Sequence, residues 1–210
     1  MTTPPDRLTM TTIVADRALA VVRAPEIPDP VALANALARL GIRALELTFT
    51  TPGVLGCLRE AATSQAVLGV GTVLTADQAR AAVDAGARFL VTPGIRVDVA
   101  GVAAGGGIPV IMGALTPTEV LVALDLGAAA VKIFPASALG PRYFKDLRGP
   151  LPDIALIPSG GVNAGNAADF LANGAVAVTA GPDVVPPQAV ASGNWSDIAS
   201  RAASFVQSLN

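Results

Sequence analysis

The chain has 210 residues, of which 52% are hydrophobic and 14% are charged, and its formal net charge is −2. Globular proteins average about 25% charged residues, so this composition excludes a disordered chain, and the lack of a broad positive field argues against nucleic-acid partners. The sequence contains no histidine, which excludes histidine-based triads and most zinc sites. Proton transfer therefore falls to carboxylates, lysine or tyrosine.

The single cysteine, Cys57, allows no internal disulfide, which fits a reducing cytoplasm. Without a histidine partner we interpret it as a packed helix residue. The stretch between Asp98 and Glu119 is uncharged, but glycines and prolines interrupt it, whereas a membrane-spanning helix needs continuous apolar residues. The first ten residues lack the apolar core of a signal peptide. We expect a cytoplasmic protein that has no membrane partner.

Short apolar runs alternate with alanine-rich segments of helical length, and the pair recurs about every 20 to 25 residues. The predicted strands are residues 18–24, 44–50, 66–73, 89–94, 109–115, 129–136, 154–161 and 175–181. The segments between them start at polar residues or proline, and four of them end at Gly41, Gly86, Gly127 and Gly174, as helices with a left-handed final residue do.

Parallel strands need helical connections, and strands that are covered on both faces read as continuous apolar runs. Eight strand–helix repeats therefore predict a (β/α)8 TIM barrel. A doubly wound open sheet usually has fewer strands and a glycine fingerprint after its first strand, which is absent here. We expect an extra N-terminal helix at residues 5–17 that covers the barrel bottom and a closing helix at 194–208. No linker is visible, so residues 1–210 are predicted to form one barrel domain.

In such barrels the chemistry lies at the C-terminal ends of the strands. The first predicted strand ends at Arg23, which could clamp a carboxylate or be a solvated rim charge. In the second strand, period-2 alternation places Glu46, Thr48 and Thr50 on one face. A carboxylate among hydroxyl groups near a lysine can transfer protons; the alternative is an ion pair that only supports the core.

The third predicted strand ends at Thr72, where Gly69 and Gly71 leave room for close approach of a ligand. Thr72 could bind that ligand or be a structural hydroxyl. Pro93 and Gly94, after the fourth strand, are expected to shape the rim rather than to react.

The sixth predicted strand contains a lysine, although the chain has 12 arginines and only two lysines, Lys132 and Lys145. If Val131 and Ile133 face the helices, Lys132 points into the barrel. Burial disfavours the ammonium form and favours the neutral amine, which can attack a carbonyl. The alternatives are a charge that protects an exposed edge strand and a lysine whose head reaches water. A closed barrel has no edge strand, and we therefore interpret Lys132 as a nucleophile.

The last two predicted strands end in IPSGGVN and VTAGP. Glycine-rich turns that lead into helices present backbone N–H groups, which can hold a phosphate without a basic patch. In (β/α)8 enzymes a phosphate is often bound between loops seven and eight. The candidate residues in these loops are Ser159, Gly160, Gly161 and Gly181, although glycine also simply makes tight turns.

These residues together suit imine chemistry on a 2-oxo acid, with Lys132 as nucleophile and Glu46 as proton carrier, and they need no metal and no cofactor. Two alternatives remain at this point. One is a phosphate-binding barrel isomerase or synthase that uses the same two residues as acid and base. The other is a non-catalytic barrel that binds a ligand, in which Lys132 and Glu46 form an ion pair.

The sequence resembles the 2-keto-3-deoxy-6-phosphogluconate (KDPG) / 4-hydroxy-2-oxoglutarate (KHG) aldolases, the class I aldolases of the Entner–Doudoroff pathway of carbohydrate metabolism. The resemblance runs from about residue 18 to residue 186. Its most specific pieces are ELTFTTP, GVGTVLT, VTPG, VKIFPAS and IPSGGVN, which contain Glu46, Thr72, Pro93, Lys132 with Phe134, and Gly160 with Gly161.

The resemblance implies a metal-independent lyase, a cytoplasmic homotrimer that cleaves a 2-keto-3-deoxy-6-phosphosugar acid to pyruvate and glyceraldehyde 3-phosphate. It implies that Lys132 forms the Schiff base, that Glu46 is the acid and base, and that Thr72 and an arginine hold the pyruvate carboxylate. Many members have arginine where Thr50 stands, and Arg23 can replace it. The usual Gly-Ser after strand eight is Gly181-Pro182 here, and Pro182 offers a phosphate neither a hydroxyl nor an N–H group.

Overall fold

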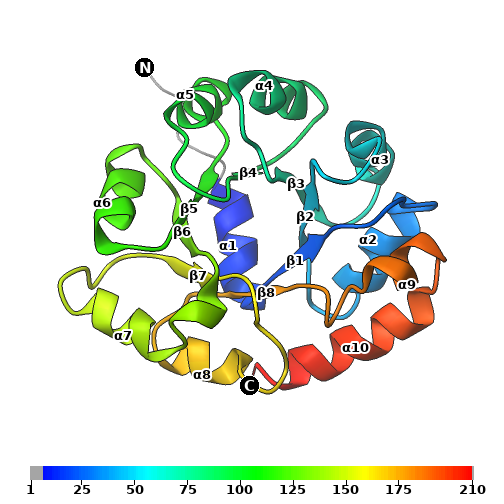
Figure 1. Ribbon diagram of the computed structural model, residues 1–210. Helices are drawn as coiled ribbons and strands as arrows, with labels where there is room; N and C mark the ends of the chain where they lie inside the picture. The colour runs from blue at the N-terminus through cyan, green and yellow to red at the C-terminus, as the bar shows by residue number, and fades with distance from the viewer. Residues whose placement is uncertain (1–6, 210) are drawn as a thin grey trace.

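The computed structural model describes residues 7–209 and shows a barrel of eight parallel strands surrounded by helices (Figure 1). The ladders run in the order β7-β6-β5-β4-β3-β2-β1-β8. The remaining gap is closed where Val176 N donates to Leu156 O (2.9 Å) and Thr179 Oγ1 donates to Pro158 O (3.0 Å). The predicted (β/α)8 barrel is therefore confirmed. The strands are β1 (Ala18–Val22), β2 (Ala44–Thr48), β3 (Val67–Gly71), β4 (Leu90–Val91), β5 (Val110–Ala114), β6 (Ala130–Ile133), β7 (Leu156–Pro158) and β8 (Val178–Ala180).

Helices follow the strands as predicted, and the predicted glycine stops have left-handed backbones, with φ between 78° and 101°. Cys57 packs against the core from α3, as expected, and burial raises the pKa of its thiol. No helix within residues 7–209 combines the length and the apolar character needed to cross a membrane. The helices are α1 (Arg7–Asp16), α2 (Pro30–Ala38), α3 (Val54–Ala61), α4 (Ala76–Asp84), α5 (Val97–Gly106), α6 (Pro117–Asp125), α7 (Arg142–Arg148), α8 (Ala167–Ala172), α9 (Pro187–Ala191) and α10 (Trp195–Gln207), with a short 3-10 turn η1 (Ala136–Ala138).

Helix α1 closes the bottom of the barrel, as the sequence predicts; residues 5 and 6 of the predicted helix lie outside the described residues. Figure 1 shows α1 crossing the axis of the barrel. Its Ile13 is completely buried, and Met10 packs beside it against the barrel interior. The interior residues that form one cluster with Ile13 are all apolar: Leu19, Ala44, Phe89, Val91, Ile111, Ala130, Ile157 and Ala177.

The strands place alternate residues inside and outside the barrel, as period-2 geometry requires. In β6, Val131 and Ile133 join the apolar cluster between strands and helices, whereas Ala130 belongs to the interior cluster. In β2, Leu45 and Leu47 pack outward in the same way. Lys132 therefore points into the barrel, as the alternation predicts.

Candidate active site

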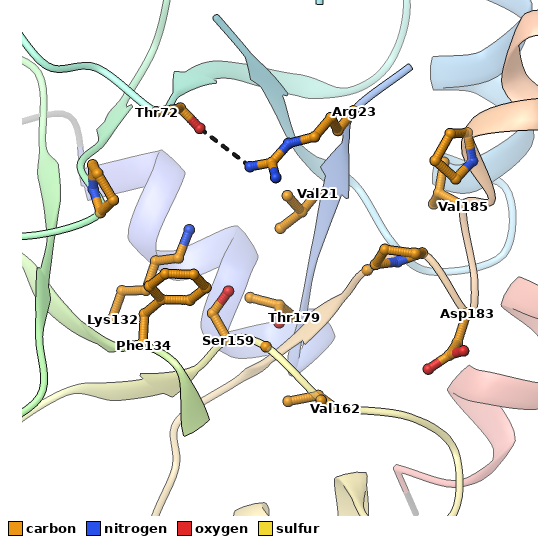
Figure 2. Close-up of a pocket in the computed structure, with 16 residues that line it drawn as sticks. Val21, Arg23, Thr72, Lys132, Phe134, Ser159, Val162, Thr179, Asp183 and Val185 are labelled. Carbon is orange, nitrogen blue, oxygen red and sulfur yellow. Dashed lines mark hydrogen bonds between the residues drawn. The ribbon is translucent and has the colours of Figure 1, made fainter. Parts of the chain in front are cut away.

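A cavity of about 470 Å³ opens at the C-terminal ends of the strands. Figure 2 shows its wall, with side chains from β1, β6 and β8 and from the segments that follow β1, β3, β4, β6, β7 and β8. The residues that line it are Val21, Arg23, Thr72, Pro93, Lys132, Phe134, Ser159, Gly160, Gly161, Val162, Thr179, Gly181, Pro182, Asp183, Val185 and Pro187.

Lys132 is the buried cation of this cavity. The residue is 7% exposed, and its Nζ lies 3.6 Å from Glu46 Oε2 and 5.7 Å from the centre of the Phe134 ring. Phe134 itself is 43% exposed and forms part of the cavity wall. An amine that is surrounded by protein and faces a cavity can meet a carbonyl while water is largely excluded, which is what an imine-forming lysine requires.

Glu46 is fully buried, and within residues 7–209 neither of its carboxylate oxygens has a hydrogen-bond partner. Its only charged neighbour among the described residues is Lys132. Space for the carboxylate comes from Gly71 of β3, since a Cβ atom at position 71 would overlap with Glu46 Oε1. A buried carboxylate that lacks hydrogen bonds is costly, so such a group in a native fold calls for a functional explanation.

The residues that follow β1 and β3 contact each other in the cavity wall. Arg23 Nη2 donates a hydrogen bond to Thr72 Oγ1 at 3.5 Å (Figure 2). Thr72 has φ = 56°, a left-handed conformation that is strained for a β-branched residue. The next residue, Val73, fixes this conformation, because its side chain is buried and its amide donates to Val91 O (3.1 Å). The strained backbone sets the position of the Thr72 hydroxyl.

Three predicted site residues are not part of the cavity wall: Glu46, Thr48 and Thr50. Thr48 is buried, and its Oγ1 is 2.9 Å from Oγ1 of the exposed Thr50. The neighbouring Thr51 accepts a hydrogen bond from Ala24 N (3.3 Å) and so connects the ends of β1 and β2. The structure brings the other predicted residues together: Arg23, Thr72, Pro93, Lys132, Phe134, Ser159, Gly160, Gly161 and Gly181 all line the cavity, and Glu46 contacts Lys132.

The loop after β7 turns sharply at Gly160 (φ = 87°) and Gly161 (φ = 78°). A side chain at position 161 would collide with Ser137, so the turn has little room for anything but glycine. The sequence predicted that this loop leads directly into a helix, but α8 begins only at Ala167. The loop amides therefore lie outside the first turn of that helix.

Sequence reasoning missed several residues of the wall. Thr179 of β8 could have been predicted, because it lies two residues before Gly181 and strand alternation therefore turns it toward the same side. Asp183 follows the end of β8, where strand periodicity no longer predicts direction. The other missed residues are apolar or proline: Val21, Val162, Val185 and Pro187.

Comparisons with known proteins agree with this geometry. Residues 10–201 match the family described as "Aldolase: KDPG and KHG aldolase". A 2-dehydro-3-deoxy-phosphogluconate aldolase of Treponema pallidum (strain Nichols) is 37% identical over 186 residues, which cover 87% of this chain and 88% of the relative.

Two solved structures are similar along almost the whole chain. A KDPG aldolase from Legionella pneumophila, described with pyruvate captured as a covalent carbinolamine intermediate, has a TM-score of 0.85 and 31% identity and covers 92% of this chain and 96% of its own. A cube-shaped protein cage designed by fusing symmetric oligomeric domains has a TM-score of 0.83 and 33% identity, covering 91% of this chain and 71% of its own. With a family match over residues 10–201, this chain belongs to the KDPG and KHG aldolase family, whose members are carbon–carbon lyases.

Proposed function

We propose that this protein is a class I aldolase that cleaves KDPG to pyruvate and glyceraldehyde 3-phosphate and KHG to pyruvate and glyoxylate. The observation that carries the proposal is the buried Lys132 amine, which faces the cavity with Glu46 3.6 Å away. The similarity to an aldolase described with covalently captured pyruvate supports the same chemistry.

In the proposed reaction the neutral amine of Lys132 attacks the C2 carbonyl of the substrate. The resulting carbinolamine loses water to form an iminium ion, which is an electron sink. A base removes the proton of the C4 hydroxyl, the C3–C4 bond breaks, and its electron pair forms an enamine. The aldehyde leaves, the enamine is protonated at C3, and water hydrolyses the iminium to release pyruvate and the free amine.

Glu46 is the proposed acid and base for these steps, directly or through a water molecule. No other carboxylate among the described residues lies within ion-pair distance of Lys132. Because neither oxygen of Glu46 has a hydrogen-bond partner in residues 7–209, both are free to take or give a proton.

The remaining candidates are proposed to bind the two ends of the substrate. Arg23 and Thr72 would hold the pyruvate carboxylate, since the guanidinium and the hydroxyl already contact each other. Pro93 and Phe134 would shape the wall on either side of the imine. We propose that the aldehyde end is bound by Ser159, Gly160, Gly161 and Gly181.

We also propose a cytoplasmic homotrimer. Similarity to the symmetric oligomeric domain of a designed cage supports an oligomer. The chain also exposes several large apolar side chains, among them Leu121, Val122 and Leu124 of α6, which an interface would cover. Light scattering coupled to gel filtration should report three times the mass of 20.9 kDa. A monomer would contradict this part of the proposal.

The experiment that tests the proposed chemistry is borohydride reduction in the presence of pyruvate, read by intact mass and peptide mapping. Wild type should gain one reduced pyruvate adduct on Lys132, and Lys132→Ala should gain none. Lys145→Ala is the matched control, because it removes the only other lysine, which is exposed on α7, and should leave the adduct unchanged. Folded wild-type protein that forms no adduct would overturn the aldolase proposal in favour of a barrel enzyme that uses no covalent imine.

A further inference from the structure

The two ends of the cavity carry opposite charges. Among the described residues that line it, the cations are Arg23, which contacts Thr72, and Lys132, which contacts Glu46; Figure 2 shows both away from Asp183. The one anion of the wall is Asp183, at the other end, where Figure 2 shows it across from Val162 of the glycine loop. A substrate whose 2-oxo group meets Lys132 and whose carboxylate meets Arg23 must extend its far end toward Asp183.

The glycine loop offers hydrogen-bond donors to that far end. No hydrogen bond within residues 7–209 uses the amide hydrogens of Gly160, Gly161 or Val162. The loop itself is fixed, because Asn166 Nδ2 donates to Gly161 O at 2.8 Å. These amides can therefore bind an oxygen atom of the substrate, whether it belongs to a hydroxyl or to a phosphate.

The segment after β8, on the other side, has two features that disfavour a phosphate. Pro182 has no amide hydrogen, and the exposed carboxylate of Asp183 has no ion-pair partner among residues 7–209. The nearby cation, Arg201, forms its ion pair with Asp197 (Nε to Oδ2, 2.9 Å) and contacts Asp183 only at the backbone oxygen, to which its Nη1 donates (3.2 Å). The negative charge of Asp183 therefore acts on whatever occupies this end of the cavity.

We propose that the aldolase cleaves substrates with a terminal phosphate, KDPG included, less efficiently than 2-keto-3-deoxy acids whose carbon chain ends in a hydroxyl. The inference rests on the proposed function, because the position of the imine decides which end of the substrate reaches Asp183. A hydroxyl can accept from the glycine-loop amides and donate to the Asp183 carboxylate. A phosphate dianion can only accept, and the carboxylate repels it.

The test is to measure kcat/KM for 2-keto-3-deoxygluconate and for its 6-phosphate, and to take the ratio of the phosphorylated to the unphosphorylated substrate. In wild type this ratio should be one or less. Asp183→Asn should raise it about tenfold, because the repulsion is removed in a partly solvated site. Pro182→Ser combined with Asp183→Asn should raise it further, since serine adds an N–H and a hydroxyl donor.

The matched control is Asp153→Asn, which removes the same charge from an exposed loop before β7, at the opposite end of that strand, and should leave the ratio unchanged. Salt provides a second measurement that needs no variant. Raising the ionic strength from about 0.02 M to about 0.5 M should increase the ratio in wild type, because salt screens the repulsion, but should have little effect on the ratio in Asp183→Asn.

Two failures are distinguishable. If the lysine adduct forms but wild type prefers the phosphorylated substrate tenfold or more, the inference is overturned while the proposed function stands. The same holds if the adduct forms but neither salt nor Asp183→Asn changes the ratio. If no adduct forms and neither substrate is cleaved, the proposed function is overturned and the inference falls with it.

Discussion

Two layers of the barrel interior lie only two residues apart along the same strands, yet their chemistry is opposite. The lower layer, next to α1, is apolar and includes Ala44 of β2 and Ala130 of β6. The upper layer, two residues further along these strands, contains Glu46 and Lys132. The upper layer also contains Ser159 and Thr179, which lie two residues after the lower-layer residues Ile157 and Ala177.

The difference shows how one scaffold separates stability from chemistry. Folding removes the apolar side chains of the lower layer from water and buries no charge there, so their burial stabilises the barrel. The upper layer holds a carboxylate without hydrogen bonds and a buried amine, which are unfavourable for folding. Apolar packing below and around the barrel offsets that cost, and the predictions for the two layers below test this division.

The largest effect is expected from removing the charges of the upper layer. Lys132→Met should lower kcat/KM by at least about a thousandfold, because the nucleophile is lost. It should also reduce the free energy of unfolding by about 3 to 5 kcal/mol, since Glu46 becomes a buried charge without a partner. Urea unfolding and steady-state kinetics measure both effects.

The double variant Lys132→Met/Glu46→Leu makes the upper layer resemble the lower one. It should regain most of the lost stability, because no buried charge remains, while staying inactive. If the double variant were no more stable than Lys132→Met, the upper layer would not be costly and the division proposed above would be wrong.

A variant in the lower layer should lose stability without losing activity. Leu19→Ala should reduce the free energy of unfolding by about 2 to 5 kcal/mol, because it leaves a cavity in a fully buried cluster. The kcat/KM of the folded enzyme should stay within about twofold of wild type. Val14→Ala, which shortens an exposed side chain of α1, is the control and should change stability by less than about 0.5 kcal/mol. A large activity loss in Leu19→Ala would mean that the layers are not separate.

A smaller effect is expected from Gly71→Ala, which adds one methyl group to the upper layer. The new Cβ would overlap with Glu46 Oε1, so the carboxylate must move away from Lys132. A displacement of this kind should lower kcat about a hundredfold, while borohydride trapping still labels Lys132. Gly56→Ala is the matched control, because position 56 lies in α3 with open space around it. Activity equal to wild type in Gly71→Ala would show that the placement of Glu46 is not critical.

The smallest effect concerns the rim above the upper layer, where Glu119 caps α6. The amides of Thr116 (2.8 Å) and Leu115 (2.9 Å) donate to Glu119 Oε2 and hold the pKa of that carboxyl below its ordinary value of 4.5. The stabilisation is therefore present above about pH 4.5 and is lost as the pH falls through the lower pKa of the folded state.

Glu119→Gln should therefore lower the free energy of unfolding by about 0.5 to 1 kcal/mol at pH 7. The difference from wild type should shrink as the pH is lowered to about 3. Thermal unfolding of both proteins at the two pH values measures it. A difference that did not change with pH would mean that the carboxylate charge is not what the capping amides stabilise.

Periodicity in the sequence predicted the eight strands, the glycine stops and the inward direction of Lys132, because each depends on local spacing alone. Strand lengths were less predictable: the run 89–94 yields a strand of only two residues, Leu90–Val91. Thr48 and Thr50 share the face of Glu46 in the sequence pattern, but β2 ends at Thr48, and beyond that point the pattern no longer fixes direction. Asp183 lies in a loop, and its place in the cavity wall depends on packing between distant segments.

The closure of the barrel bottom by α1 imposes an order on the proposed reaction. Among the described residues, apolar side chains fill the interior below Lys132, so ligands reach the amine through the mouth at the strand ends. The aldehyde product lies between the covalently held pyruvate unit and that mouth, so it must leave first. In the direction of synthesis pyruvate must enter first, and the aldehyde then meets an enzyme that already carries the enamine.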